Sequence, residues 1–192
     1  MSPERRLAVL DAAVKVGTVA VLAWAVLDPA LPQFSGKAFM GRALAYPIAL
    51  VILPIGWWII GRPRVPFPVV ADILFGLPFL IDVVGNALDL YDSIEWWDDA
   101  NHLVNWALHT AAVGLLLRSG PWGRWTRMAL AIGWAATTAV AWELAEYVAF
   151  VPDSPEAATA YADTLGDLAL GLVGGVVAAI VVSRAPPLTQ RS

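Results

Sequence analysis

The chain has 192 residues, of which 59% are hydrophobic and 15% charged, and its formal net charge is −4. Because a soluble domain carries about 45–50% apolar residues and a short chain exposes much of its surface, this composition excludes an ordinary soluble protein. The sequence contains no cysteine, which excludes disulfides and thiolate metal sites.

Six apolar stretches follow one another along the chain. Each is close to the ~20 residues that a helix needs to cross the ~30 Å hydrocarbon layer, and lipid cannot satisfy the backbone of an open sheet. The predicted helices cover approximately Leu7–Leu27, Ala43–Ile60, Val69–Leu90, Ala100–Leu117, Met128–Phe150 and Tyr161–Ser183. We therefore predict an all-α, polytopic transmembrane bundle of six helices that forms a single integral membrane domain over residues 1–192.

Basic residues predict the orientation of this bundle. Only Lys37 and Arg42 fall on one side of a six-helix arrangement, whose loops are otherwise acidic. The opposite side carries nine arginines: Arg5, Arg6, Arg62, Arg64, Arg118, Arg124, Arg127, Arg184 and Arg191. By the positive-inside rule the arginine-rich side is cytoplasmic. We expect both termini in the cytoplasm and the acidic loops outside a bacterial plasma (inner) membrane.

Four of the predicted helices carry ionisable residues three or four positions apart, and such residues share one helix face. This predicted cluster comprises Asp82 in the third helix, Asp98, Asp99, His102 and His109 in the fourth, Glu143 and Glu146 in the fifth, and Asp163 and Asp167 in the sixth. At ~1.5 Å of rise per residue, alternating helices bring these side chains into the outer half of the bilayer. We therefore expect them to line one polar site.

The predicted cluster holds many carboxylates and two imidazoles, and it includes no lysine or arginine. Several anions in a low-dielectric layer cannot all stay ionised without a counter-charge. Protonation, a water-filled cavity or bound divalent cations would each resolve this conflict. Carboxylates and histidines at helical spacing are typical of metal sites in helical bundles. Ligands of this kind, without sulfur, suit Zn, Mn or Fe better than Mg or Ca.

Within a metal site, the predicted ligands are His102, Glu143, Glu146, Asp163 and Asp167. We expect further ligands or a general acid/base from Asp82, Asp99 and His109. Simpler interpretations remain open for several of these residues. Asp163 and Asp167 can favour the positive end of a helix dipole, Asp99 can be solvated, and each histidine can form hydrogen bonds inside the bundle.

Other features of the sequence predict structural contacts. Asp72 lies near the inner interface, and we expect it to pair with an arginine. The candidate partners are Arg62, Arg64 and Arg127. Lys15 has Asp11 as its i,i+4 partner on the first helix. The spacing Gly171-x-x-x-Gly175, with Gly174 between them, predicts close helix packing.

These same motifs resemble those of the YjdF-like family of bacterial inner-membrane proteins, which is itself similar to the broader VanZ-like group. The family pattern of an acid before a histidine, then Glu-x-x-Glu, then Asp-x-x-x-Asp, matches Asp98/Asp99 with His102, Glu143 with Glu146, and Asp163 with Asp167. The resemblance covers about Asp82–Val182. Asp-Ala-Asn-His stands here where the family has Lys or Arg and a Gly before the histidine, which makes this cluster more acidic. The resemblance implies the site and no settled activity.

The leading hypothesis is a small membrane enzyme that uses a divalent metal ion to hydrolyse a lipid or lipid-linked substrate, because a metal-activated water needs no additional cofactor. A transporter or channel for protons or metal ions is one alternative, since intramembrane acids often mark ion paths. Another alternative is a non-catalytic protein that binds an extracytoplasmic ligand, as the VanZ-like resemblance implies. The expected partners are the lipid bilayer and a lipid-linked substrate, and no nucleic acid.

Overall fold

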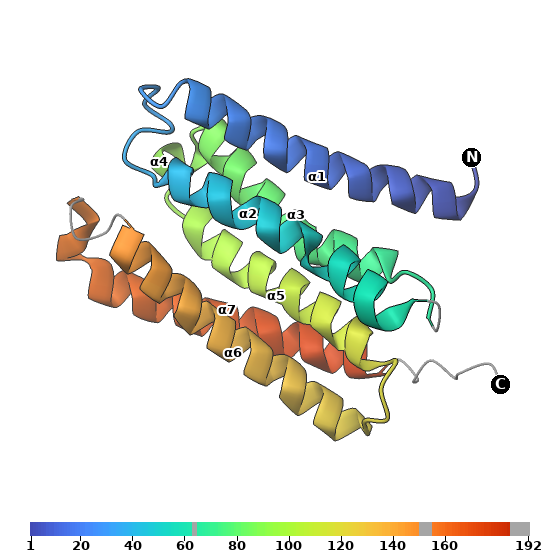
Figure 1. Ribbon diagram of the computed structural model, residues 1–192. Coiled ribbons are helices and arrows are strands. Elements are labelled where there is room, and N and C mark those ends of the chain that lie inside the picture. Colours follow the sequence, from blue (N-terminus) through green and yellow to red (C-terminus); the bar gives the residue numbers. More distant parts are fainter. Residues whose placement is uncertain (63–64, 150–154, 185–192) are drawn as a thin grey trace. The chain divides into compact units, whose positions relative to one another are not determined.

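The computed structural model describes residues 1–62, 65–149 and 155–184. Over these residues the chain is all-α, as predicted, and it forms two compact units, unit 1 (Met1–Ile94) and unit 2 (Glu95–Ser192) (Figure 1). Arg64, Phe150 and Arg191, which the sequence predictions used, lie outside the described residues. The single membrane domain over residues 1–192 stays a prediction.

Unit 1 is built around its third helix. Its elements are α1 (Pro3–Leu27), α2 (Phe39–Gly56) with the π-helical turn η1 (Trp57–Gly61), α3 (Val69–Ala87) and the short α4 (Leu90–Ser93). α3 packs against both α1 and α2, and it contributes Val83, which is fully buried. Pro54 interrupts the hydrogen-bond ladder of α2 because it has no backbone N–H, and the π-helical turn follows within one turn of it.

Unit 2 consists of three long helices that all pack on one another. They are α5 (Trp97–Leu117), α6 (Arg124–Ala149) and α7 (Ala160–Arg184), with the short 3₁₀ helix η3 (Pro155–Ala158) before α7. α5 and α7 run in the same direction and α6 runs in the opposite one (Figure 1). The start of α5, the end of α6 and the start of α7 therefore share one end of unit 2.

Small residues allow α7 to approach its two neighbours closely. A Cβ added at Gly174 would collide with the backbone carbonyl oxygen of Leu103 in α5, and one added at Gly175 would lie 2.7 Å from the Cβ of Ala135 in α6. Ala131, Ala135 and Ala139 form the buried stripe of α6. The close packing predicted for the glycines of α7 is confirmed.

Within the described residues, five helices are long and apolar enough to cross a membrane. They are Pro3–Leu27, Phe39–Gly61, Val69–Ala87, Arg124–Ala149 and Ala160–Arg184. α5 begins and ends close to the predicted fourth span, but its polar residues keep it out of this set. The protein is therefore a polytopic helical bundle whose apolar helices contact the lipid bilayer, while six crossings and cytoplasmic termini stay predictions.

Candidate metal centre

The three helices of unit 2 bring acids and an imidazole together at one end. α5 places Asp98 in its first turn, where a carboxylate favours the positive end of the helix dipole, and His102 one turn later. α6 contributes Glu143 and Glu146 from its final two turns, and α7 contributes Asp167 from its second turn. Residues far apart in the sequence thus meet because the three helices alternate in direction.

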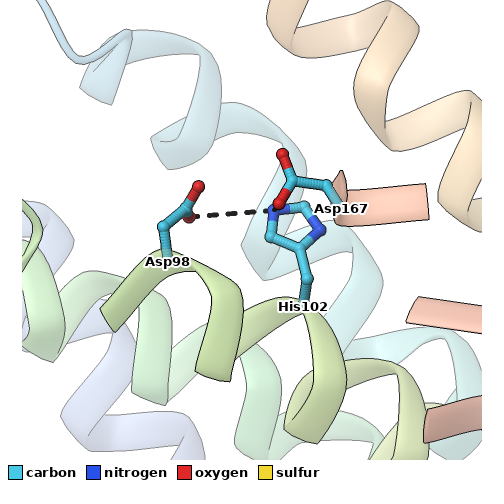
Figure 2. A group of neighbouring side chains, drawn as sticks. All are labelled: Asp98, His102 and Asp167. Atoms are coloured by element: carbon cyan, nitrogen blue, oxygen red, sulfur yellow. Dashed lines mark ion pairs between the residues drawn. The ribbon is translucent and has the colours of Figure 1, made fainter. Parts of the chain in front are cut away.

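Acids approach the His102 ring on both of its nitrogen atoms. Nε2 lies 3.7 Å from Oδ1 of Asp98 and 3.7 Å from Oδ1 of Asp167 (Figure 2). Nδ1 lies 3.6 Å from Oε1 of Glu143. His102 therefore belongs to two groups whose ligand atoms all lie within 4.8 Å of one another, one with Asp98 and Asp167 and one with Glu143 and Glu146.

These nitrogen–oxygen separations fit an intervening ion better than a direct hydrogen bond. A hydrogen bond between such atoms spans about 2.7–3.2 Å. Two ligand atoms bound tetrahedrally to one ion at about 2.0–2.2 Å lie roughly 3.4 Å apart. The separations around His102 are close to that second value, so little movement would let the acids that face one of its nitrogen atoms share a metal ion with it.

Most of the centre is buried, and two of its acids, Glu143 and Asp167, form no ion pair with a lysine or arginine among the described residues. Only 7% of the His102 side chain, 9% of the Glu143 side chain and 6% of the Asp167 side chain are exposed. Thr164 forms a hydrogen bond with Glu143, but Oε1 of Glu143 has no hydrogen-bond partner in the part of the chain that the structure describes. Buried carboxylates of this kind favour a bound cation.

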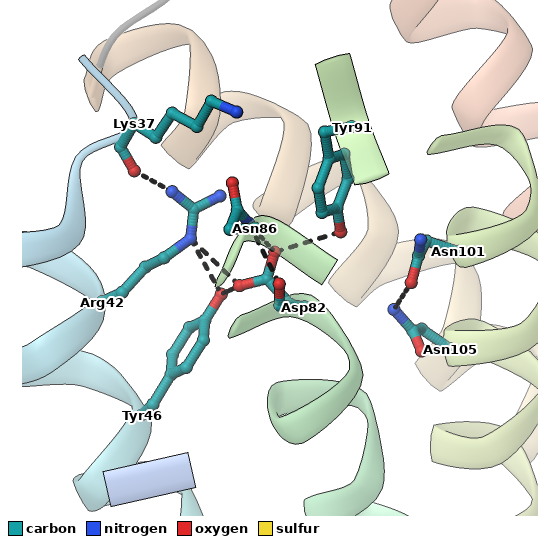
Figure 3. Close-up of polar contacts among 8 residues, drawn as sticks. All are labelled: Lys37, Arg42, Tyr46, Asp82, Asn86, Tyr91, Asn101 and Asn105. Atoms are coloured by element: carbon teal, nitrogen blue, oxygen red, sulfur yellow. Dashed lines mark hydrogen bonds and ion pairs between the residues drawn. The ribbon is translucent and has the colours of Figure 1, made fainter. Parts of the chain in front are cut away.

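The other candidates of unit 2 lie outside the two groups. Asp99 and Asp163 are exposed, each within one turn of a residue of the centre. His109 lies two turns further along α5, with its ring edge-on to Trp106 at a centroid separation of 5.5 Å. Between the two histidines, Asn105 donates a hydrogen bond to Asn101 (3.2 Å; Figure 3). Polar side chains therefore continue along α5 from His102 to His109.

Asp82 lies in unit 1, where its carboxylate already has a cationic partner. Oδ2 accepts hydrogen bonds from Arg42 Nε (3.0 Å) and from the Tyr46 hydroxyl (2.6 Å), and Oδ1 accepts hydrogen bonds from Tyr91 and Asn86 (Figure 3). The prediction that Asp82 has no basic neighbour was wrong. It failed because Arg42 was assigned to a loop, whereas α2 begins at Phe39 and carries Arg42 in its first turn.

Asp72 also has a different partner from the one predicted. Its Oδ2 accepts a hydrogen bond from Nζ of Lys15 in α1, and the same ammonium group contacts Asp11 at 2.7 Å. The expected pairing of Asp72 with an arginine was therefore wrong. Sequence reasoning considered Lys15 only with its neighbour on the same helix and missed the packing of α1 on α3.

Lys37 forms a more exposed ion pair in the same unit. Its Nζ lies 2.5 Å from Oδ2 of Asp92, whose side chain is 57% exposed. The hydrogen bond from Lys37 holds the pKa of Asp92 below its usual value. Both basic residues on the predicted acidic side, Lys37 and Arg42, are thus bound to acids of unit 1.

Residues 10–186 match a protein family described as predicted membrane protein (DUF2238). The chain belongs to this family. The match includes every residue of the candidate centre, and the DUF2238 description agrees with the helices that are suited to crossing a membrane. No curated protein and no solved structure matches the chain. The narrower resemblance to YjdF-like and VanZ-like proteins stays a prediction.

Proposed function

We propose that unit 2 holds a divalent-metal centre in the outer half of the bilayer. We further propose that the protein uses this centre to hydrolyse a lipid or lipid-linked substrate. One observation carries the proposal: His102 lies 3.6–3.7 Å from acids of three different helices. Two of these acids, Glu143 and Asp167, are buried without a lysine or arginine partner among the described residues. A cation would neutralise them and replace the long nitrogen–oxygen contacts with metal–ligand bonds.

The two groups around His102 describe two ways to hold one ion. An ion bound through Nε2, Asp98 and Asp167 leaves the Nδ1–H group directed at Glu143. An ion bound through Nδ1, Glu143 and Glu146 leaves the Nε2–H group directed at Asp98 and Asp167. Either arrangement supplies the carboxylate that usually orients the second nitrogen of a metal-bound histidine. We favour the Nε2 side, because the Asp98 side chain is 44% exposed and leaves access for a substrate.

The ligand set also limits which metal ions suit the centre. One imidazole with several carboxylate oxygens and no sulfur suits Mn, Fe or Zn, and a greater share of oxygen ligands moves the preference towards Mn and Fe. Mg and Ca prefer all-oxygen sites, so we rank them lower. We also propose Asp163 as a ligand. It precedes Asp167 by one turn of α7, so a small movement of this helix would bring its carboxylate to the same ion.

Hydrolysis is the proposed reaction because a bound divalent ion can supply an activated water without a further cofactor. Asp99 is exposed beside Asp98, which gives it access to solvent and to a substrate group that must gain or lose a proton. The apolar helices around the centre suit a substrate that remains in the lipid phase. His109 lies deeper along α5, and we assign it to the polar line behind the centre rather than to a step of the reaction.

Metal analysis and lipid turnover test this proposal together. We expect the purified wild type, loaded and then dialysed, to retain about one metal ion per chain. Glu143→Gln and Asp167→Asn should retain much less. Asp28→Asn is the matched control, because Asp28 is an exposed acid at the end of α1 in unit 1. Product release from a panel of phospholipids and isoprenoid-linked lipids should need the metal and disappear in His102→Ala.

Two results would contradict the proposal. If the wild type retained far less than one metal ion per chain under metal-replete conditions, the metal centre would be excluded. Full metal retention with no turnover of any lipid class would support the metal centre but exclude the hydrolase activity.

Transport of protons or metal ions is a second candidate function, and a line of polar side chains along α5 favours it. Polar side chains follow one another along α5 from Asn101 to Thr110, a rise of about 13 Å. Oδ1 of Asn105 and Oγ1 of Thr110 are buried, and neither has a hydrogen-bond partner among the described residues. Flux of protons or Mn²⁺ into proteoliposomes that is abolished by Glu143→Gln would place this candidate above hydrolysis.

A further inference from the structure

At the other end of unit 2, a buried arginine has two guanidinium nitrogen atoms without a hydrogen-bond partner in the described part of the chain. Arg127 is only 5% exposed. Its Nε and Nη1 atoms are enclosed, and neither has a hydrogen-bond partner among the described residues. A guanidinium group cannot give up its proton at any ordinary pH, so burial leaves a positive charge that requires an anion.

No acid of the chain is available near Arg127 on its own helix or on the facing parts of α5 and α7. The sequence has no Asp or Glu from residue 100 to residue 142, and none from residue 168 to residue 192. The same end of unit 2 carries Arg118 after α5, Arg124 at the start of α6 and Arg184 at the end of α7. Unit 2 therefore has its acids at one end and its arginines at the other.

The first turn of α6 adds further donors. The backbone N–H of Arg127 bonds to the carbonyl oxygen of Gly123 (3.0 Å), so the N–H groups of the three preceding residues have no carbonyl four positions earlier within the helix. Side chains on a helix lean towards its N-terminus, which directs the Arg127 guanidinium back towards these N–H groups. Both features attract an anion to the start of α6.

Two tryptophans place this end at the level of lipid headgroups. Trp122 and Trp125 flank the start of α6 and are 46% and 69% exposed, and the Arg124 guanidinium lies 5.2 Å from the centre of the Trp125 ring. Exposed tryptophans are enriched where a membrane protein crosses the headgroup region. The anion present at that depth is the phosphate of a phospholipid, and an arginine binds phosphate through two parallel hydrogen bonds.

We propose that Arg127 and the first turn of α6 bind the phosphate group of an anionic phospholipid. This site is separate from the metal centre and does not depend on it. Lipid binding fills the hydrogen-bonding capacity of the guanidinium and neutralises its charge. The lipid acts as a structural ligand that holds the adjoining ends of α5, α6 and α7 together.

Thermal unfolding of the full chain in neutral detergent tests this site. We expect phosphatidylglycerol to raise the transition temperature of the wild type by several degrees, as a ligand specific for the folded state does, and phosphatidylcholine to raise it much less. Arg127→Met should lose most of this increase. Without lipid, Arg127→Met should unfold at the wild-type temperature or above it, because it removes a buried unpaired charge. Arg124→Gln, at an exposed arginine of the same turn, should keep the increase.

Other outcomes would overturn the proposal. An equal loss in Arg124→Gln would show diffuse attraction to the basic end, and a full increase in Arg127→Met would show that the lipid binds elsewhere. If inorganic phosphate alone reproduced the increase, a free phosphate and not a lipid would be the ligand. Should Arg127→Met fail to fold, Arg127→Lys keeps the charge without the paired hydrogen bonds, and native mass spectrometry should find fewer bound phosphatidylglycerol molecules on it than on the wild type. Equal numbers would count against the site.

Discussion

Lys15 of α1 forms an ion pair with Asp72 of α3, 57 residues away in the sequence. The same ammonium group contacts Asp11 at 2.7 Å, so one cation serves two acids in the interior of unit 1. Asp72 is 2% exposed, and a charge buried to this degree is stable only beside its counter-charge. The pair therefore fixes how α1 packs on α3.

Removal of the cation should destabilise unit 1 strongly. Lys15→Met leaves Asp11 and Asp72 facing each other without a counter-charge, and breaking a buried pair in this way costs about 3–5 kcal/mol. We expect that loss in the free energy of unfolding, measured by SDS titration with tryptophan fluorescence as the signal. The double variant Lys15→Met/Asp72→Asn should recover part of the loss, because it also removes one unpaired acid. Additive effects of the two substitutions would contradict the pairing.

Two ion pairs of unit 1, Arg42–Asp82 and Lys37–Asp92, should differ sharply in their contribution to stability. Asp82→Asn removes the buried counter-charge of Arg42 and is expected to cost about 3 kcal/mol. Asp92→Asn removes an exposed partner of Lys37 and should cost less than about 1 kcal/mol. Chemical denaturation of both variants measures this contrast. Equal losses would show that the Asp82 network contributes no more than a surface pair.

The Lys37–Asp92 pair also predicts a small pH dependence. Because Lys37 lowers the pKa of Asp92 in the folded protein, the pair stabilises the fold at pH values above the pKa of an unfolded aspartate. This contribution disappears as the pH falls through the lower pKa of the folded state. The stability difference between the wild type and Asp92→Asn should therefore shrink on acidification. A difference that stays constant down to strongly acidic pH would contradict the assignment.

Two glycines of unit 2 should respond oppositely to alanine. Gly174→Ala forces a methyl group into the backbone of α5 at Leu103 and should cost about 3 kcal/mol, at the upper end of overpacking effects. Gly133 of α6 has open space around it, so Gly133→Ala should raise helix stability by about 0.5–1 kcal/mol. Thermal unfolding distinguishes the two. A tolerated Gly174→Ala would contradict the close contact between Gly174 of α7 and Leu103 of α5.

Metal retention should decrease on acidification. Carboxylate and imidazole ligands must be deprotonated to bind a metal ion, so protons compete with it. We expect dialysis at successively lower pH to remove the metal from the wild type, and neutral pH with added metal to restore it. The same series on Asp163→Asn tests whether Asp163 is a ligand. A profile like that of the wild type would exclude Asp163, whereas loss of metal at neutral pH would support it.

The sequence predicted the fold class and most of the candidate centre, and the reasons are local. Apolar runs of helical length set the helix positions, and the spacing of Glu143 with Glu146 and of Asp98 with His102 placed these side chains on shared faces. The partner of Asp72 was missed because the pairing joins α1 to α3. The partner of Asp82 was missed because Arg42 was expected in a loop, whereas it lies in the first turn of α2. Spacing along one helix does not reveal the contacts that Lys15 and Arg42 make with another helix, because these contacts depend on how α1, α2 and α3 pack.

Anomalous X-ray scattering from crystals of the metal-loaded protein shows directly whether a metal ion binds at His102. We expect one peak about 2.0–2.3 Å from a nitrogen of His102, with carboxylate oxygens of Asp98 and Asp167, or of Glu143 and Glu146, at similar distances. Absence of a peak at His102, with these acids turned away from the ring or protonated and bonded to one another, would show that unit 2 holds no metal centre there.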